Sequence, residues 1–315
     1  VPANDADGSY TISWGAATHA TSYQLYEGSS LIHNSSARSK AFSGKSSAVY
    51  SYKVRACNAL GDCGTYSTVK TTRVSRIPAA PALTVPATDP DGAYSVSWGA
   101  VTHATAYQLV EGSSTVHNSS ARSKAFSGKS SAVYSYKVRA CNALGDCGAY
   151  STVKTTRVSR IPSAPALTVP ANDPDGAYSV SWGAVTHATS YQLVEGSSTV
   201  HNSSTRSKAF SGKSSAVYSY KVRACNALGD CGSYSTVKTT RVSRIPAAPA
   251  LTAPANDADG SYTISWGAAT HAATYQLYEG SSLIHNSSAR SKGVAGKLTG
   301  TYGYKVRSCN TLGDC

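Results

Sequence analysis

Hydrophobic and polar residues alternate over short stretches of the chain, most clearly between residues 79 and 162. Residues 94–98 read Tyr-Ser-Val-Ser-Trp, and residues 134–140 read Tyr-Ser-Tyr-Lys-Val-Arg-Ala. A period of two residues is typical of a β-strand with one buried face. Shorter runs predict further strands at 82–85, 106–110, 115–117, near 126 and at 150–158. With about seven short strands and no stretch of helical period, the pattern predicts an all-β fold, an antiparallel β-sandwich.

The whole pattern returns with a fixed period. Four tryptophans lie 84 residues apart and predict one core Trp in each copy: Trp14, Trp98, Trp182 and Trp266. A fixed period of this length indicates an array of small units rather than one large fold. The predicted domains are residues 1–78, whose first strand is incomplete, 79–162, 163–246, and 247–315, whose last strand is missing.

The cysteines follow the same period. All eight lie in the motif Cys-Asn-x-Leu-Gly-Asp-Cys, which favours one disulfide within each copy: Cys57 with Cys63, Cys141 with Cys147, Cys225 with Cys231, and Cys309 with Cys315. A metal site is the alternative, but two cysteines would need two further ligands at fixed spacing, and the nearest His lies far upstream. Disulfides predict an oxidising, extracytoplasmic location.

The residues of each copy resemble the fibronectin type III family. In the second copy the resemblance rests on Trp98, Tyr107 and the run from Tyr134 through Val138, Ala140 and Asn142 to Gly145. It covers essentially the whole chain and implies tandem seven-stranded, immunoglobulin-like sandwiches. It also implies a tyrosine corner, in which a hydroxyl bonds back to nearby backbone, at Tyr50, Tyr134, Tyr218 and Tyr302.

Two features depart from the family pattern. The family has no standard disulfide, and the paired cysteines around the last hairpin turn look like a feature of large secreted bacterial proteins of this class. The Arg-Gly-Asp tripeptide of some animal members is absent from every copy. The resemblance therefore does not imply integrin binding of the animal type.

Charge adds a candidate binding surface. The net charge is +13, and each complete copy carries eight Lys and Arg against four Asp and Glu. Lys53 and Arg55 lie on one predicted strand, and Lys70 and Arg73 on the last. If these strands pair, the four cations are predicted to form one face for anionic polysaccharide, extracellular DNA or a cell envelope; an ordinary solvated face is the alternative. Base stacking is not indicated, because Tyr50 and Tyr52 are predicted to point inward.

No residue pattern predicts catalysis, a metal or a cofactor. His19, His33 and their copies are the only histidines, and a loop position explains them better than a zinc or catalytic role. The nucleophile motif Gly-x-Ser-x-Gly is absent. The turn at residues 89–92, Asp-Pro-Asp-Gly, offers two carboxylates, whereas calcium takes six to eight oxygens, so turn chemistry is the simpler explanation. Asn34 and its copies match a glycosylation acceptor, which would matter only in a eukaryotic host.

The linkers are short and rich in proline, for example Ile-Pro-Ala-Ala-Pro at residues 77–81. Such linkers are semi-rigid, and equal linkers between equal units predict a stiff rod or a filament. The incomplete end copies leave two interpretations open. A neighbouring chain could supply the missing strand by β-augmentation, or the sequence is an excerpt of a continuous polymer.

These observations predict a non-enzymatic, extracellular or cell-surface array that forms a stalk, fibre or filament. Its expected partners are neighbouring repeats or further copies of itself, and anionic polysaccharide or cell envelope. We expect no cofactor, no specific nucleic acid and no membrane span, since no apolar run approaches about 20 residues. The alternative is an accessory glycan- or surface-targeting spacer region of a secreted bacterial hydrolase or toxin, with the cationic face or Tyr26 touching polysaccharide.

Overall fold

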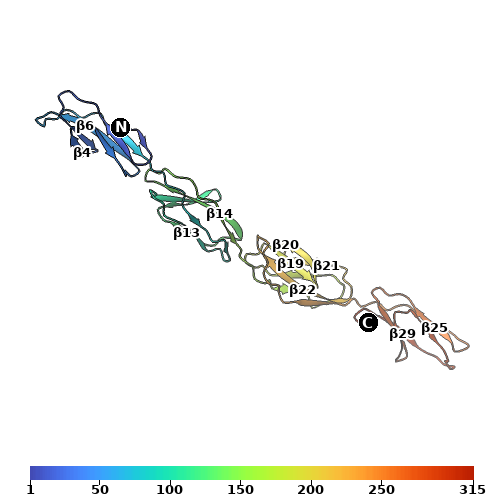
Figure 1. Ribbon diagram of the computed structural model, residues 1–315. Coiled ribbons are helices and arrows are strands. Elements are labelled where there is room, and N and C mark those ends of the chain that lie inside the picture. The colour runs from blue at the N-terminus through green and yellow to red at the C-terminus, as the bar shows by residue number, and fades with distance from the viewer. The chain divides into compact units, whose positions relative to one another are not determined.

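The chain is built of β-strands joined by turns and loops, as the computed structural model of residues 1–315 shows (Figure 1). Its contacts divide it into two compact units, Val1–Arg160 and Ile161–Cys315. Each unit contains two separate hydrophobic cores, one for each copy of the sequence pattern. The all-β class predicted from the alternating pattern is therefore confirmed.

The strands of unit 1 are short. They are β1 (Asn4–Asp5), β2 (Tyr10–Ser13), β3 (Ser22–Glu27), β4 (Ser30–Ser35), β5 (Ser39–Phe42), β6 (Ala48–Cys57), β7 (Lys70–Val74), β8 (Leu83–Thr84), β9 (Thr88–Asp89), β10 (Tyr94–Trp98), β11 (Ala106–Glu111), β12 (Ser114–Ser119), β13 (Ser123–Phe126), β14 (Ala132–Cys141) and β15 (Lys154–Val158).

The strands of unit 2 repeat this order. They are β16 (Leu167–Thr168), β17 (Asn172–Asp173), β18 (Tyr178–Trp182), β19 (Ser190–Glu195), β20 (Ser198–Ser203), β21 (Ser207–Phe210), β22 (Ala216–Cys225), β23 (Lys238–Val242), β24 (Leu251–Thr252), β25 (Tyr262–Trp266), β26 (Thr274–Glu279), β27 (Ser282–Ser287), β28 (Ser291–Val294) and β29 (Tyr304–Cys309).

The second copy shows the complete topology. Strands β13, β10 and β8 form one sheet, and strands β12, β11, β14, β15 and β9 form the other. Neighbouring strands are antiparallel except for β9, which pairs with β15 in parallel. The sequence did not predict β9, because its residues belong to the turn-forming stretch before Gly92. Their backbone nevertheless bonds to the last strand, as Ser159 N–H donates to the Asp89 carbonyl at 2.8 Å.

The alternating pattern determines which side chains form the core. Val96, Leu109 and Val138 are fully buried. The register places Leu109 opposite Val138 on one face of the larger sheet, and Val96 of the smaller sheet belongs to the same core cluster. Full burial of one such side chain stabilises a fold by about 1.5–3 kcal/mol. The intervening residues of β14, among them Lys137 and Arg139, point to the outer face of the sheet and are half-buried.

The turn before the first core strand explains the Asp-Pro-Asp-Gly motif. The Asp89 carboxylate accepts the Gly92 amide, and the Asp91 carboxylate accepts the Ala93 amide at 2.9 Å. Gly92 has a φ of 80°, and a Cβ there would lie 2.3 Å from the Lys129 carbonyl oxygen. The carboxylate oxygens that a calcium ion would need already accept hydrogen bonds from backbone amides. The motif therefore stabilises the turn.

Candidate functional site

Each copy ends its longest strand in a loop closed by a disulfide. The four predicted disulfides are present, with S–S distances of 1.98, 2.00, 1.96 and 1.95 Å in chain order. We call the enclosed segments the disulfide loops; they comprise residues 57–63, 141–147, 225–231 and 309–315. All eight cysteines are bonded, which confirms the predicted disulfides and leaves no thiol for metal binding or redox catalysis.

The loop of residues 141–147 is fixed from inside by one asparagine. The Asn142 side-chain oxygen accepts the amides of Leu144 and Asp146 at 2.9 and 3.0 Å. Gly145 occupies the left-handed region with a φ of 81°, as the tight turn requires. The disulfide and these bonds hold the Asn142 amide group and the Asp146 carboxylate in a defined position.

In unit 1 this loop binds the end of the first copy. The Asp146 carboxylate forms an ion pair with Arg73 and accepts a hydrogen bond from the Ser75 hydroxyl. The Asn142 side-chain amide donates to the Ser75 hydroxyl at 3.1 Å and to the Arg76 carbonyl at 3.3 Å. Asn142 is only 2% exposed. We call this set of contacts the junction clamp.

The backbone also approaches closely at the clamp. A Cβ placed on Gly148 would lie 2.0 Å from the Pro78 carbonyl oxygen. Real Cβ atoms do not come so near to backbone, so the position accepts only glycine while the two segments are in contact. In unit 2, a Cβ placed on Gly232 would lie 1.9 Å from the Pro162 carbonyl oxygen.

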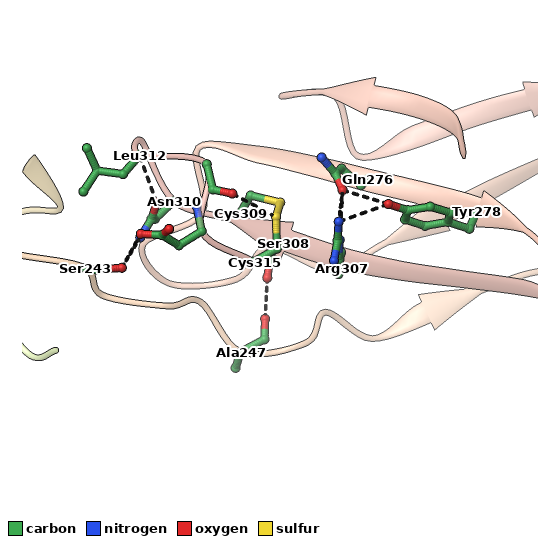
Figure 2. The surroundings of a disulfide bond; sticks show 12 residues. Ser243, Ala247, Gln276, Tyr278, Arg307, Ser308, Cys309, Asn310, Leu312 and Cys315 are labelled. Carbon is green, nitrogen blue, oxygen red and sulfur yellow. Dashed lines mark hydrogen bonds between the residues drawn. A yellow bond between two sulfur atoms is a disulfide. The ribbon is translucent and has the colours of Figure 1, made fainter. Parts of the chain in front are cut away.

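Unit 2 contains a second complete clamp. Arg241 forms an ion pair of 2.6 Å with Asp314, and the Asn310 amide donates to the Ser243 hydroxyl at 3.2 Å. Figure 2 shows Asn310 reaching Ser243 beside the Cys309–Cys315 disulfide, with Ser308 donating to the Ala247 carbonyl at 2.6 Å. Two independent occurrences indicate that the arrangement is a regular feature of the copies.

The contacts of the junction clamp lower the pKa of its two aspartates. Hydrogen bonds from Ser75 and Arg73 lower the pKa of Asp146. Bonds from Arg241 and Ser243 lower the pKa of Asp314 to about 2. Bonds to the charged form of a carboxylate favour that form. Both groups are therefore ionised at neutral and mildly acidic pH, which is the state that the arginines bind.

A second feature lies on the outer face of strands β3 and β6. Lys53 Nζ lies 4.3 Å and the Arg55 guanidinium carbon 4.9 Å from the ring centre of Tyr66. Tyr26 packs edge-on against Tyr66 with 5.3 Å between ring centres. Arg55 donates from Nε and Nη2 to the Gln24 side-chain oxygen at 2.9 and 2.8 Å. Cations and rings therefore form one ordered cluster.

The cluster recurs in every copy, and we call it the cation–aromatic face. In the middle copies Lys137 and Arg139 flank Tyr150, at 4.6 and 4.8 Å, and Lys221 and Arg223 flank Tyr234, at 4.6 and 4.7 Å. Valine replaces the second tyrosine there. In the last copy Lys305 and Arg307 both lie 5.5 Å from Tyr278, and Arg307 also bonds to Gln276 (Figure 2).

The structure divides the predicted cationic face. Lys53 and Arg55 lie together on the outer side of the sheet formed by β3 and β6. Lys70 pairs opposite Tyr52, whose side chain is buried, so Lys70 belongs to the other side of the strand pair. Arg73 pairs opposite the exposed Val49 but is engaged in the junction clamp. The prediction that all four cations share one face is therefore wrong.

A buried polar chain was not predicted. The Tyr10 and Tyr52 hydroxyls lie 2.6 Å apart, and Tyr52 donates to Glu27 at 2.9 Å. Lys45 Nζ donates to the same carboxylate at 2.6 Å and lies 4.5 Å from the ring centre of Tyr50. Burial, followed by these bonds, raises the pKa of Tyr52 and keeps it neutral. In each copy a lysine forms an ion pair with the single glutamate: Glu27, Glu111, Glu195 and Glu279.

The predicted tyrosine-corner positions make the backbone bond that the resemblance implies. The Tyr50 hydroxyl donates to the Ser46 carbonyl at 3.1 Å, and Tyr134 donates to the Ser130 carbonyl at 3.2 Å. Tyr218 and Tyr302 bond to the carbonyls four residues before them, at 3.1 and 3.0 Å. The bonds stabilise the start of each long strand, which carries the cation–aromatic face and ends at the disulfide loop.

Both histidine positions have structural explanations. His19 has a φ of 62°, a left-handed conformation in which His is enriched. His33 lies edge-on to Trp14, 5.5 Å between ring centres, and its ring bonds to the Ser35 hydroxyl at 2.9 Å. The predicted core Trp98, Trp182 and Trp266 are each 5% exposed, whereas Trp14 is only partly buried. Strand β8, which pairs with Trp98, has no counterpart in the first copy.

No family model matches the chain. It is 26% identical over 290 residues to Exoglucanase B of Cellulomonas fimi; the match covers 82% of this chain and 26% of that protein. The chain thus spans about a quarter of the length of the curated relative it matches. No helix in the structure has the length and apolar character needed to cross a membrane.

Solved structures with similarity include the chicken CNTN1 FN1–FN3 domains, at 16% identity and a TM-score of 0.27, covering 76% of this chain and 96% of that one. The fibronectin(III)-like modules of Clostridium thermocellum CbhA give 13% identity and 0.27, covering 50% and 90%. A Bacteroides ovatus protein, SGBP-B in complex with a mixed-linkage heptasaccharide, gives 14% and 0.23, covering 98% and 87%.

The two-sheet topology and the repeated core decide the class. The chain has tandem β-sandwiches, with the two-sheet arrangement that the resemblance to the fibronectin type III family implies. The copies carry two candidate functional features, the junction clamp between copies and the cation–aromatic face on each copy.

Proposed function

We propose that the chain is a non-catalytic extracellular spacer whose copies are held in a fixed relation by junction clamps. The observation that carries the proposal is the repeated set of Arg, Ser, Asn and Asp contacts, which occurs once in unit 1 and once in unit 2. A spacer needs resistance to bending at each linker. A disulfide-braced loop that binds the preceding linker supplies that resistance together with the proline-rich sequence.

Two settings fit a spacer. In one, the array forms a stalk or fibre, with copy number determining its length and copies of the chain associating into a filament. In the other, it links or targets the catalytic part of a secreted bacterial hydrolase. The relationship to Exoglucanase B favours the second setting. The disulfides support an extracellular or cell-surface location in both, because such bonds persist in oxidising surroundings.

Small-angle X-ray scattering of the full chain tests the spacer proposal. We expect Gly148→Ala to broaden the distance distribution relative to that of the native chain, because a Cβ at this position forces Pro78 away. The matched variant Gly64→Ala should leave the scattering unchanged, since its Cβ would meet only the Ala56 carbonyl oxygen, at 3.8 Å. A distance distribution that Gly148→Ala leaves unaltered would show the spacer proposal to be wrong.

A further inference from the structure

We propose that the cation–aromatic face of each copy binds acidic polysaccharide, a chain of sugars that carry carboxylate groups. The face is defined in the first copy by Lys53, Arg55 and Tyr66, with Tyr26 and Gln24 beside them. The proposal does not depend on the spacer function, because the clamp residues lie elsewhere on the copy.

The first step concerns charge. The acidic groups of the first copy are all engaged away from this face. Glu27 pairs with Lys45 at 2.6 Å, the carboxylates of Asp5 and Asp7 accept backbone amides, and Asp62 accepts from Asn58. Lys53 and Arg55 therefore form no ion pair within their copy, and the face keeps an uncompensated positive field. Such a field attracts an anionic ligand.

The second step concerns geometry. The Gln24 side-chain oxygen holds Arg55 by Nε and Nη2, and the structure gives Nη1 no acceptor. Tyr66 supports both cations from below, at 4.3 and 4.9 Å. The two long side chains are thus ordered before any ligand arrives, so binding requires little further loss of side-chain entropy. The free guanidinium hydrogens and the Lys53 ammonium are suitable donors for carboxylates.

The third step distinguishes polysaccharide from nucleic acid. Single-stranded nucleic acid binds to ring faces that are open for base stacking. Here the cations lie over the tyrosine face, and Tyr26 packs against Tyr66, which is 40% exposed. The rings therefore offer edges and hydroxyls, which suit sugar hydroxyl groups, rather than an open stacking platform. We accordingly favour acidic polysaccharide over nucleic acid.

The fourth step concerns repetition. A lysine and an arginine lie beside a tyrosine ring in each copy, and the copies are covalently joined. A polymer of repeating acidic sugars can occupy several clusters at once, which raises the overall affinity by orders of magnitude above that of one cluster. Binding should weaken steeply as salt screens the exposed charges.

The test compares two triple variants of the full chain by biolayer interferometry on immobilised polygalacturonate. The first, Lys53→Gln with Lys137→Gln and Lys221→Gln, removes three charges from the proposed face. The matched control removes three charges from the opposite side of the strand pair, at Lys70, Lys154 and Lys238. We expect the first variant to lose more than about tenfold in affinity, through the lost multivalent contacts, and the control to lose less than about twofold. Equal losses would overturn the proposal.

A second measurement needs no variant. Fully methyl-esterified polygalacturonate has the same backbone without the charge, and it should not compete for the native chain. Competition by the ester equal to that of the acid would overturn the proposal, as would tighter binding to a single-stranded oligonucleotide than to polygalacturonate. Scattering of the Lys53→Gln triple variant should match that of the native chain, so a failure of this proposal and a failure of the spacer proposal can be told apart.

Discussion

The disulfide loops of residues 57–63 and 141–147 have the same sequence but different surroundings. In both, the asparagine side-chain oxygen accepts two loop amides at 2.9–3.0 Å. The second loop binds residues of the preceding copy, whereas the first forms no such contact in unit 1. Leu60 is 87% exposed, while Leu144 is partly buried. The comparison teaches that the loop is already shaped by its own bonds, and that the neighbouring copy binds a preformed surface.

Opening the disulfide loop of residues 141–147 should have the largest effect on stability. Cys141→Ser with Cys147→Ser removes a closed loop of seven residues, which costs about 2 kcal/mol in the chain-entropy description, and also releases the bound linker. Cys57→Ser with Cys63→Ser should lower the free energy of unfolding only by the loop-closure contribution, because this loop binds no linker. Calorimetry of the full-chain variants checks this, and the comparison fails if the two double variants unfold alike.

Gly148→Ala should have the next largest effect, by weakening the contact between the two copies at the junction clamp. Neither Gly148 nor Gly64 has a left-handed backbone, so alanine is tolerated at both except for the contact with Pro78. Overpacking of this kind costs about 1–3 kcal/mol. We expect trypsin to cleave the Arg76–Ile77 bond faster in Gly148→Ala.

Mass spectrometry of the tryptic fragments supplies the controls for this variant. Cleavage of the Arg244–Ile245 bond in unit 2 should keep its native rate, and Gly64→Ala should leave both rates unchanged. An equal acceleration at both bonds in Gly148→Ala would instead indicate general loosening of the chain.

Neutralising one carboxylate should have a smaller effect. Asp146→Asn keeps the shape of the side chain but removes the charge that Arg73 binds. We expect moderately faster cleavage after Arg76, whereas Asp62→Asn, in the loop without a neighbour, should change nothing. If Asp62→Asn accelerates the cleavage equally, the ion pair does not hold the junction.

The smallest effect concerns pH. A carboxylate with a lowered pKa contributes to docking above its ordinary value, about 3.9, and loses this contribution as the pH falls through the lowered value. The contribution of Asp314 should therefore persist at pH 4 and be lost near its pKa of about 2. Carbon-detected NMR titration of the Asp314 carboxyl checks this, and a midpoint at the ordinary value would remove the basis of the prediction.

Sequence could predict the features that depend on local pattern. The period-two alternation identifies strands such as Tyr94–Trp98, and the repeated cysteine spacing identifies the disulfides. The junction clamp could not be found in this way, because Arg73 and Asp146 lie 73 residues apart and belong to different copies. A repeat period aligns equivalent positions but does not indicate which different positions meet.

The misplacement of Lys70 had a signal that was available in the sequence. Lys70 and Arg73 lie three residues apart on one strand, and side chains alternate between faces with a period of two. They therefore cannot share a face in a regular strand. The cation–aromatic face could not be read from the pattern. Tyr150, the counterpart of Tyr66, begins the predicted strand 150–158, whereas the structure begins that strand only at Lys154 and leaves both tyrosines in the preceding loops.

A double-mutant cycle tests the central claim most directly, with the trypsin rate at Arg76–Ile77 as its measure. The account predicts that Arg73→Ala and Asp146→Ala are non-additive, because either substitution removes the same contact. Arg73→Ala and Asp62→Ala should combine additively. Additive effects for Arg73 and Asp146 would contradict the account, since the two residues would then not hold the copies together.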